Sequence, residues 1–135
     1  MLRARNSDGY PALLNNVEVE FLQGDLFDSL AGRKFDLIIA NPPYVKTSEI
    51  PNLPRFVLDY APKLAIDGGE DGLYFQRRVI FNAPNFLKPE GLLFIECEDE
   101  QDVEIFKLSE DYGWQVENTL KNRHGKIRGF QLSRR

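Results

Sequence analysis

Blocks of apolar and polar residues along the chain switch between two periods. Residues 17–22 alternate with a period of two, which predicts a half-exposed strand. Residues 35–40 are almost entirely apolar, which is typical of a strand covered on both faces of a parallel sheet. Three further strands are expected at residues 92–95, 114–117 and 129–132. The last two are expected to form a hairpin, which places a turn at about residues 122–126.

Apolar residues spaced by three and four predict two helices between these strands. The first runs from residue 72 to about 86 behind an N-cap at Asp71, and Pro84 should end it early. The second spans residues 102–111, and a short helical turn is expected at 26–30. The inward residues of the second helix are expected to be Val103, Phe106 and Leu108. Strands that alternate with helices predict an α/β fold with a mainly parallel sheet.

The four residues Asn41, Pro42, Pro43 and Tyr44 form a distinctive turn after the second predicted strand. Two prolines fix φ and remove two backbone donors, so the turn is stiff and presents carbonyl oxygens. The side-chain oxygen of Asn41 and the carbonyl of Pro42 can accept both hydrogens of one planar NH2 group. Tyr44 can stack on the same flat group and shield it from water. A long proline-containing connection over residues 45–70 follows, and loops of this length usually bind something.

Composition limits the functions that this chain can have. The 135 residues suit one domain over 1–135, with residues 1–16 expected to be poorly ordered. A net charge of −4 argues against a protein that mainly coats nucleic acid. The one cysteine, Cys97, excludes an internal disulfide framework and fits the reducing cytoplasm, and no apolar run approaches the length that spans a membrane.

Three stretches of the sequence resemble the HemK-type methyltransferases. These stretches are residues 21–27, residues 35–44 and residues 58–72, and the similarity runs from about residue 15 to the end. Members of this family use S-adenosylmethionine to methylate the glutamine amide nitrogen of peptide-chain release factors. The Asn41–Tyr44 turn is shared with adenine-N6 methyltransferases of DNA and RNA. The run from Gly68 to Gly72 is more particular to the glutamine enzymes.

The resemblance implies a role for individual residues. Asn41, Pro42, Pro43 and Tyr44 would hold the substrate amide, and Asn41 would also lie beside the methyl donor. Asp25 would approach the adenine amino group of S-adenosylmethionine, and Leu26 would line the adenine ring. Residues 45–70 would shape the pocket for the glutamine-bearing peptide of a release factor.

The sequence departs from the family in what it lacks. A Gly-rich turn after a first strand and an acidic residue after a second strand should hold the cofactor, and neither is found. The expected fold is therefore an incomplete Rossmann-like methyltransferase sheet. Its missing strands would leave unpaired edges. Three outcomes stay open: direct pairing of residues 17–22 with 35–40, pairing across a homodimer or with a complementing chain, and a disordered amino terminus.

Other charged residues have simpler interpretations. The four acidic residues at 96 and 98–100 are expected to form a solvated loop, and no metal site is predicted. His124 has no second histidine or cysteine to share a metal with. The basic residues between 121 and 135 fit a solvated hairpin better than a contact with an RNA-rich partner. Two alternatives to a protein-glutamine methyltransferase stay open: a non-catalytic module without a cofactor site, and a nucleic-acid adenine-N6 methyltransferase.

Overall fold

The computed structural model describes residues 15–135, and the chain divides into two compact units, Met1–Gly32 and Arg33–Arg135. In the described part of the first unit, one short 3-10 helix, η1 (Asp28–Leu30), confirms the expected helical turn. The strand expected at 17–22 is wrong, because these residues form no strand and their apolar side chains are about half exposed. A strand needs a paired neighbouring strand, and no strand of the described residues pairs with residues 17–22. The expectation of poor order at 1–16 falls almost wholly outside the described residues.

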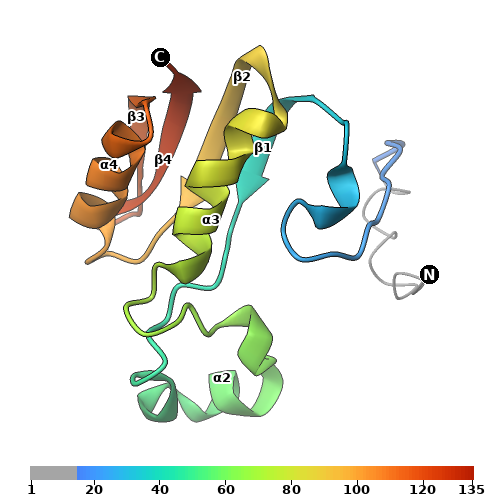
Figure 1. Cartoon of the computed structure of the whole chain (residues 1–135). Helices are drawn as coiled ribbons and strands as arrows, with labels where there is room; N and C mark the ends of the chain where they lie inside the picture. The colour runs from blue at the N-terminus through green and yellow to red at the C-terminus, as the bar shows by residue number, and fades with distance from the viewer. Residues whose placement is uncertain (1–14) are drawn as a thin grey trace. The chain divides into compact units, whose positions relative to one another are not determined.

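A four-stranded sheet forms the centre of the second unit (Figure 1). Its strands are β1 (Phe35–Ala40), β2 (Leu87–Glu96), β3 (Trp114–Lys121) and β4 (Ile127–Arg134). Their order in space is β1-β2-β4-β3, with β1 parallel to β2 and the other two pairs antiparallel. The expected late hairpin is confirmed. The expectation of a mainly parallel sheet is wrong for the part of the chain that the structure describes, because two of its three strand pairs are antiparallel.

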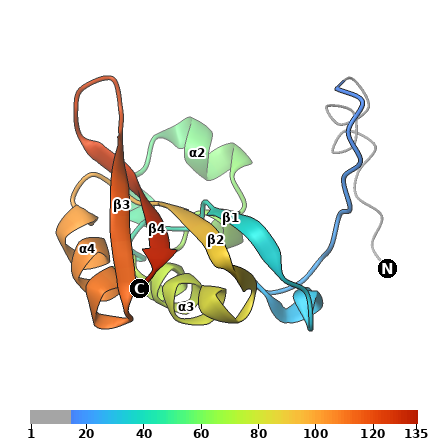
Figure 2. The same cartoon turned by 90° about the horizontal axis from the view of Figure 1, so that it is seen from above.

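Two helices, α3 (Tyr74–Asn82) and α4 (Asp102–Asp111), cover one face of this sheet (Figure 2). Leu93 and Ile95 of β2 pair with Leu132 and Phe130 of β4, and all four side chains are fully buried. Trp114 is also buried, and its indole N–H donates to the carbonyl of Ile80 in α3 at 3.0 Å. This hydrogen bond satisfies the one polar group of the largest core side chain.

The opposite face of the sheet is open at β1. Leu37 is 46% exposed and Ile39 is 75% exposed. The expectation that residues 35–40 are covered on both faces is therefore wrong, although the strand itself has the predicted bounds. β1 also ends the sheet, since no described strand pairs with its outer edge. The expectation that β1 pairs directly with residues 17–22 is accordingly wrong, and its pairing across a dimer stays a prediction.

The helices and β2 differ from expectation in detail. Helix α3 begins at Tyr74, with Leu73 rather than Asp71 at its N-cap, and it ends before a 3-10 turn, η4 (Ala83–Asn85), that contains Pro84. Helix α4 has the predicted bounds, but its buried residues are Ile105 and Ser109, and the face expected to turn inward is the wrong one. Strand β2 is longer than predicted, because it begins at Leu87 rather than at residue 92.

Residues 46–66 leave the sheet beyond the carboxyl end of β1 as a small lobe (Figure 1). The lobe contains three short helices rather than an irregular loop: η2 (Ile50–Asn52), α2 (Arg55–Tyr60) and η3 (Lys63–Ala65). Its exposed apolar residues are Phe56, Leu58, Tyr60 and Leu64. Within residues 15–135, no helix combines the length and the apolar character needed to cross a bilayer.

Candidate functional site

Asn41 lies at the carboxyl end of β1, at the edge of the sheet where ligands bind in open α/β folds. The preceding residue, Ala40, pairs with Ile95 of β2, and Asn41 is therefore the first residue beyond the paired part of β1. Its side chain is exposed and makes no hydrogen bond to any described residue. It lines a hollow of about 310 Å³ together with apolar and charged side chains that include Phe94, Glu96 and Arg128. The amide oxygen of Asn41 is thus available to a ligand.

The two prolines fix the path of the chain after Asn41. Pro42 is buried and Pro43 is half-buried, so the turn packs against the protein rather than standing free in solvent. The carbonyl of Pro42 accepts no hydrogen bond from any described residue. Asn41 and Pro42 accordingly provide two acceptor oxygens that the described protein leaves unused. These are the two acceptors that the sequence predicts for a planar NH2 group.

The run from Gly68 to Gly72 packs directly against the backbone of Tyr44. A Cβ at Gly68 would stand 2.7 Å from the Tyr44 Cα, and a Cβ at Gly72 would stand 2.4 Å from the Tyr44 carbonyl oxygen. Gly72 also has φ +76, in the left-handed region that favours glycine. Both glycines are therefore needed for the turn and the run to approach each other. This close contact gives a physical reason for a glycine run that the sequence shows only as a resemblance.

Backbone hydrogen bonds close the base of the lobe beside this contact. Val45 donates to Ile66 at 3.0 Å and accepts from Gly68 at 2.7 Å, and it forms a parallel bridge with Asp67. The Thr47 hydroxyl donates to the Asp67 carboxylate at 2.6 Å, which contributes to the lowered pKa of Asp67. The two ends of the lobe are thus tied together next to the Asn41–Tyr44 turn.

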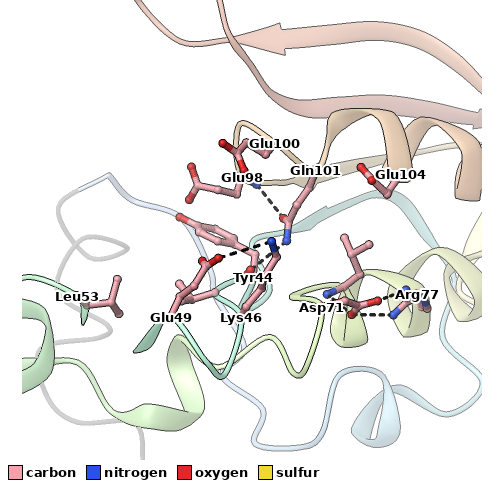
Figure 3. Close-up of a pocket in the computed structure, with 12 residues that line it drawn as sticks. Tyr44, Lys46, Glu49, Leu53, Asp71, Arg77, Glu98, Glu100, Gln101 and Glu104 are labelled. Atoms are coloured by element: carbon pink, nitrogen blue, oxygen red, sulfur yellow. Dashed lines mark hydrogen bonds and ion pairs between the residues drawn. The ribbon is translucent and has the colours of Figure 1, made fainter. Parts of the chain in front are cut away.

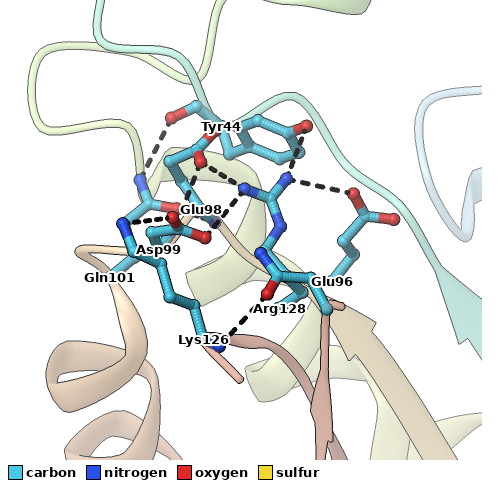
Figure 4. A network of polar contacts seen from close by, with 8 residues as sticks. Tyr44, Glu96, Glu98, Asp99, Gln101, Lys126 and Arg128 are labelled. Carbon is cyan, nitrogen blue, oxygen red and sulfur yellow. Dashed lines mark hydrogen bonds and ion pairs between the residues drawn. The ribbon is translucent and has the colours of Figure 1, made fainter. Parts of the chain in front are cut away.

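Tyr44 is held at its backbone and at its ring (Figure 4). The side-chain amide of Gln101 donates to the Tyr44 carbonyl at 3.0 Å and to the Gly72 carbonyl at 3.1 Å. The guanidinium of Arg128 lies 5.6 Å from the centre of the Tyr44 ring and donates to its hydroxyl at 3.3 Å. Burial raises the pKa of the Tyr44 phenol, the charge of Glu96 raises it further, and Arg128 opposes both. The ring predicted to stack on a substrate amide thus already contacts a cation.

Arg128 reaches this position because of the strand order. β4 begins beside the end of β2, where Gly129 pairs with Glu96, so Arg128 lies at the same sheet edge as Asn41. Its guanidinium pairs with Glu98 and with Asp99, the latter at 3.2 Å, and lies 3.8 Å from Glu96. Burial disfavours its charge, but the hydrogen bond to Asp99 and the charge of Glu98 outweigh this effect and raise the pKa of Arg128.

The predicted solvated acidic loop is therefore wrong for three of its four acidic residues. Glu96, Glu98 and Asp99 are paired with Arg128, and Lys126 adds a contact of 2.8 Å to Asp99. The expectation of a fully solvated basic hairpin is wrong for Lys126 and Arg128 for the same reason. Opposite charges from two loops that are distant in sequence meet because the β3–β4 hairpin returns to the end of β2.

A larger cavity of about 610 Å³ borders Tyr44 (Figure 3). Lobe residues Glu49 and Leu53, the start of α3 and the loop before α4 line it, together with Gln101. Asn41 is not among the residues that line it. The structure therefore places the two ends of the predicted turn on two hollows, with Asn41 in the smaller one and Tyr44 in the larger one.

Asp25 and Leu26, the predicted cofactor residues, belong to the first unit. The Asp25 side chain is exposed, and its carbonyl accepts from the backbone of Asp28 at 3.2 Å. Leu26 is half-buried and has φ +51, which is rare for a bulky residue. Strained backbone of this kind is enriched at functional sites. An exposed carboxylate next to a half-buried apolar side chain fits the amino group and the ring of an adenine.

Two residues at the site were not identified from the sequence. The sequence predicts no role for Gln101, and it places Arg128 only among the basic residues of a solvated hairpin. The available signal was weak: a glutamine directly before a helix, and an arginine directly before a glycine in a strand. Cys97 is fully buried, and burial raises the pKa of its thiol to about 12.

Known proteins with similar sequences are methyltransferases. Residues 2–70 match the family model "Methyltransferase small domain". The release factor glutamine methyltransferase of Thermodesulfovibrio yellowstonii is 41% identical over 110 residues, which are 81% of this chain and 39% of that protein. The ribosomal protein uL3 glutamine methyltransferase of Francisella tularensis is 41% identical over 83 residues, which are 62% of this chain and 26% of that protein.

A solved structure supports the fold. The ribosomal protein L11 methylase of Lactobacillus delbrueckii subsp. bulgaricus aligns with a TM-score of 0.60 and 17% identity over 96% of this chain and 51% of that one. The chain therefore belongs to the methyltransferase family with a Rossmann-like fold, and within that family to the HemK type. It spans about two fifths of the length of the curated relative from T. yellowstonii.

Proposed function

We propose that this chain carries the substrate-binding part of an S-adenosylmethionine-dependent methyltransferase that methylates a glutamine amide nitrogen in a protein. The observation that carries the proposal is the Asn41–Tyr44 turn. It follows a strand of the sheet, leaves two acceptor oxygens unused and opens on a hollow of about 310 Å³. The glycine run packed against Tyr44, and relatives named as glutamine methyltransferases, support the choice of a glutamine over an adenine.

The chemistry at the turn follows from the properties of an amide. A carboxamide nitrogen is a poor nucleophile because its lone pair delocalises into the carbonyl. Asn41 and Pro42 would accept both N–H groups, which returns electron density to the nitrogen and fixes its direction. Such positioning can lower a barrier by several kcal/mol, and acceptors aimed at the positive charge that develops on nitrogen lower it further. No histidine or carboxylate base is required before the methyl group is transferred.

S-adenosylmethionine would supply the electrophilic methyl group. The residues of the first unit fit its adenine end, where the exposed Asp25 carboxylate and the half-buried Leu26 would bind. The sequence offers no Gly-rich turn for the methionine end. We therefore expect calorimetry to show weak binding of S-adenosylmethionine by this chain alone. Tight one-to-one binding would show that this expectation is wrong.

The names of the relatives suggest two candidate protein substrates. Some are named for release factors and others for ribosomal protein uL3, so a glutamine-bearing segment of either protein is a candidate. We further propose that the protein works in the cytoplasm, where both substrates occur. A homodimer or a complementing chain would supply the neighbour that the free edge of β1 lacks among the described residues.

Methyl transfer from labelled S-adenosylmethionine tests the function. Glutamine peptides from a release factor and from uL3 are compared with adenine-containing DNA, and label should appear only in a peptide. Asn41→Ala should lower transfer by about 100-fold or more, since removal of one preorganised polar contact to a reacting group has effects of this size. Asn85→Ala, an exposed asparagine after α3, serves as the control and should transfer normally. Near-normal turnover by Asn41→Ala would rule out the proposed role.

A further inference from the structure

We propose that Gln101 and Arg128 are positioning residues that hold the backbone and the ring of Tyr44, and so orient the Asn41–Tyr44 turn for the substrate amide. This inference rests on the proposed function and adds two residues to its site. Neither residue is needed to accept the amide itself. Both act through Tyr44, one from the start of α4 and the other from the start of β4.

The side chain of Gln101 connects three backbone segments by hydrogen bonds. Its side chain is nearly buried, with 6% of the residue exposed. Both hydrogens of its amide are used, one on Tyr44 and one on Gly72, and its oxygen accepts from the backbone of Glu98 at 3.0 Å. No other amino acid of the same shape offers two donors and an acceptor in this geometry. A glutamate would turn acceptor oxygens toward two carbonyls, which leaves those carbonyls unpaired and repelled.

Arg128 fixes the ring in the same way that Gln101 fixes the backbone. Its planar guanidinium lies beside the Tyr44 ring and also donates to the hydroxyl, so rotation of the ring would break both contacts. Glu98 and Asp99 hold the guanidinium in turn. A lysine keeps the charge but lacks the flat fork that makes these contacts together.

The two hollows explain why this arrangement matters for the reaction. Arg128 lines the smaller hollow with Asn41, and Gln101 lines the larger cavity with Tyr44. Asn41 and Tyr44 belong to one short turn that two prolines stiffen, so a tilt of Tyr44 would displace Asn41 and Pro42 as well. Displacement of reacting groups by about 1 Å can lower a rate about 100-fold.

The kinetic test compares Gln101→Glu and Arg128→Lys with matched controls in the full chain. Gln115→Glu on β3 and Arg134→Lys at the end of β4 make the same chemical changes at exposed positions. We expect kcat for the glutamine peptide to fall about 100-fold in the two test variants, as positioning effects of this size predict. The change in KM should be small, and both controls should match the unaltered chain. An unchanged kcat in both test variants would overturn the proposal.

A second measurement does not depend on methyl transfer. In chains with labelled tyrosine rings, Arg128→Met should shift the Tyr44 resonances and raise the pKa of its phenol further, because Arg128 opposes that rise. Circular dichroism checks that each variant is folded. If Gln101→Glu does not fold, the result for Arg128→Met tests the proposal by itself. Unmoved Tyr44 resonances would refute the contact whatever the kinetics. If the unaltered chain transfers no methyl to any peptide but the resonances move, the proposed function fails and the structural role of Arg128 stands.

Discussion

Two neighbouring regions differ in how tightly they pack: the contact of Gly68 and Gly72 with Tyr44, which we call the base of the site, and the lobe of residues 46–66. At the base, a side chain at Gly68 or Gly72 would collide with Tyr44, and both glycines are buried. In the lobe, Phe56 is 68% exposed, Tyr60 is 87% exposed and Leu64 is 81% exposed. The base therefore holds the backbone of Tyr44 in place and tolerates no added volume. The lobe exposes large apolar side chains that contribute little to folding, which is typical of a surface that contacts another molecule.

The strongest test of the rigid base is Gly72→Ala. The added methyl group would meet the Tyr44 carbonyl at 2.4 Å and would occupy a left-handed backbone position at φ +76. We expect a loss of more than about 3 kcal/mol in the free energy of unfolding, measured by urea denaturation. Gly113→Ala is a matched control, since Gly113 also has φ +76 but a Cβ there would meet nothing within 4 Å. It should cost only about 1–2 kcal/mol. Equal losses would show that the contact with Tyr44 is not rigid.

The lobe should give the opposite result. Phe56→Ser and Tyr60→Ser should change the free energy of unfolding by less than about 0.5 kcal/mol, as is usual for exposed positions. The same changes should weaken binding of a glutamine peptide about 10-fold, measured by fluorescence anisotropy.

Tyr112→Ser is the control for the lobe variants. Tyr112 lies outside the lobe and packs edge-on against Phe81 with ring centres 5.5 Å apart. This variant should lose stability and keep its affinity for the peptide. Lobe variants that bind the peptide normally would contradict a recognition role.

The smallest expected effect concerns the negative charge of Asp71, which directly precedes Gly72. A hydrogen bond from Arg77 lowers the pKa of Asp71 from 3.8 to about 2. Because the pKa is lower in the folded state, the stabilisation is present above about pH 4 and is lost as the pH falls toward 2. Both side chains are about half exposed, so the contribution should stay below about 1 kcal/mol.

Asp71→Asn tests this contribution. The variant should be slightly less stable than the unaltered chain at pH 7 and equally stable near pH 2, measured by thermal unfolding across that range. A constant difference at every pH would indicate a role for Asp71 other than its charge.

Local patterns in the sequence predicted β1, α4 and the late hairpin, because each depends on residues close together in the chain. The site turn was also visible, since an asparagine and two prolines after an apolar strand restrict the backbone by themselves. The strand at residues 17–22 was predicted wrongly because alternation records a preference, and only a paired neighbour turns that preference into a strand. The roles of Gln101 and Arg128 depend on strand order, which brings residues 57 and 84 positions apart to Tyr44.

The prediction for α4 failed for a related reason. Its length was right, but apolar spacing alone turned Val103 and Phe106 inward, whereas Ile105 and Ser109 are buried. The hydroxyl of Ser109 donates to the carbonyl of Ile105 at 2.8 Å, so a polar residue can occupy the buried face. Packing against β3, rather than the hydropathy of the helix alone, decided the orientation.

The bridge between Val45 and Asp67 has a consequence for evolution. Because the chain leaves and returns at adjacent points, the intervening stretch can change in length or content at little entropic cost, since doubling a loop adds only about 0.6 kcal/mol. Insertions, deletions and swaps between paralogues can therefore accumulate there without disturbing the close packing of Gly68 and Gly72 against Tyr44. Divergence among homologues should concentrate within these two points, and grafting this stretch from one homologue to another is the simplest route to a new target.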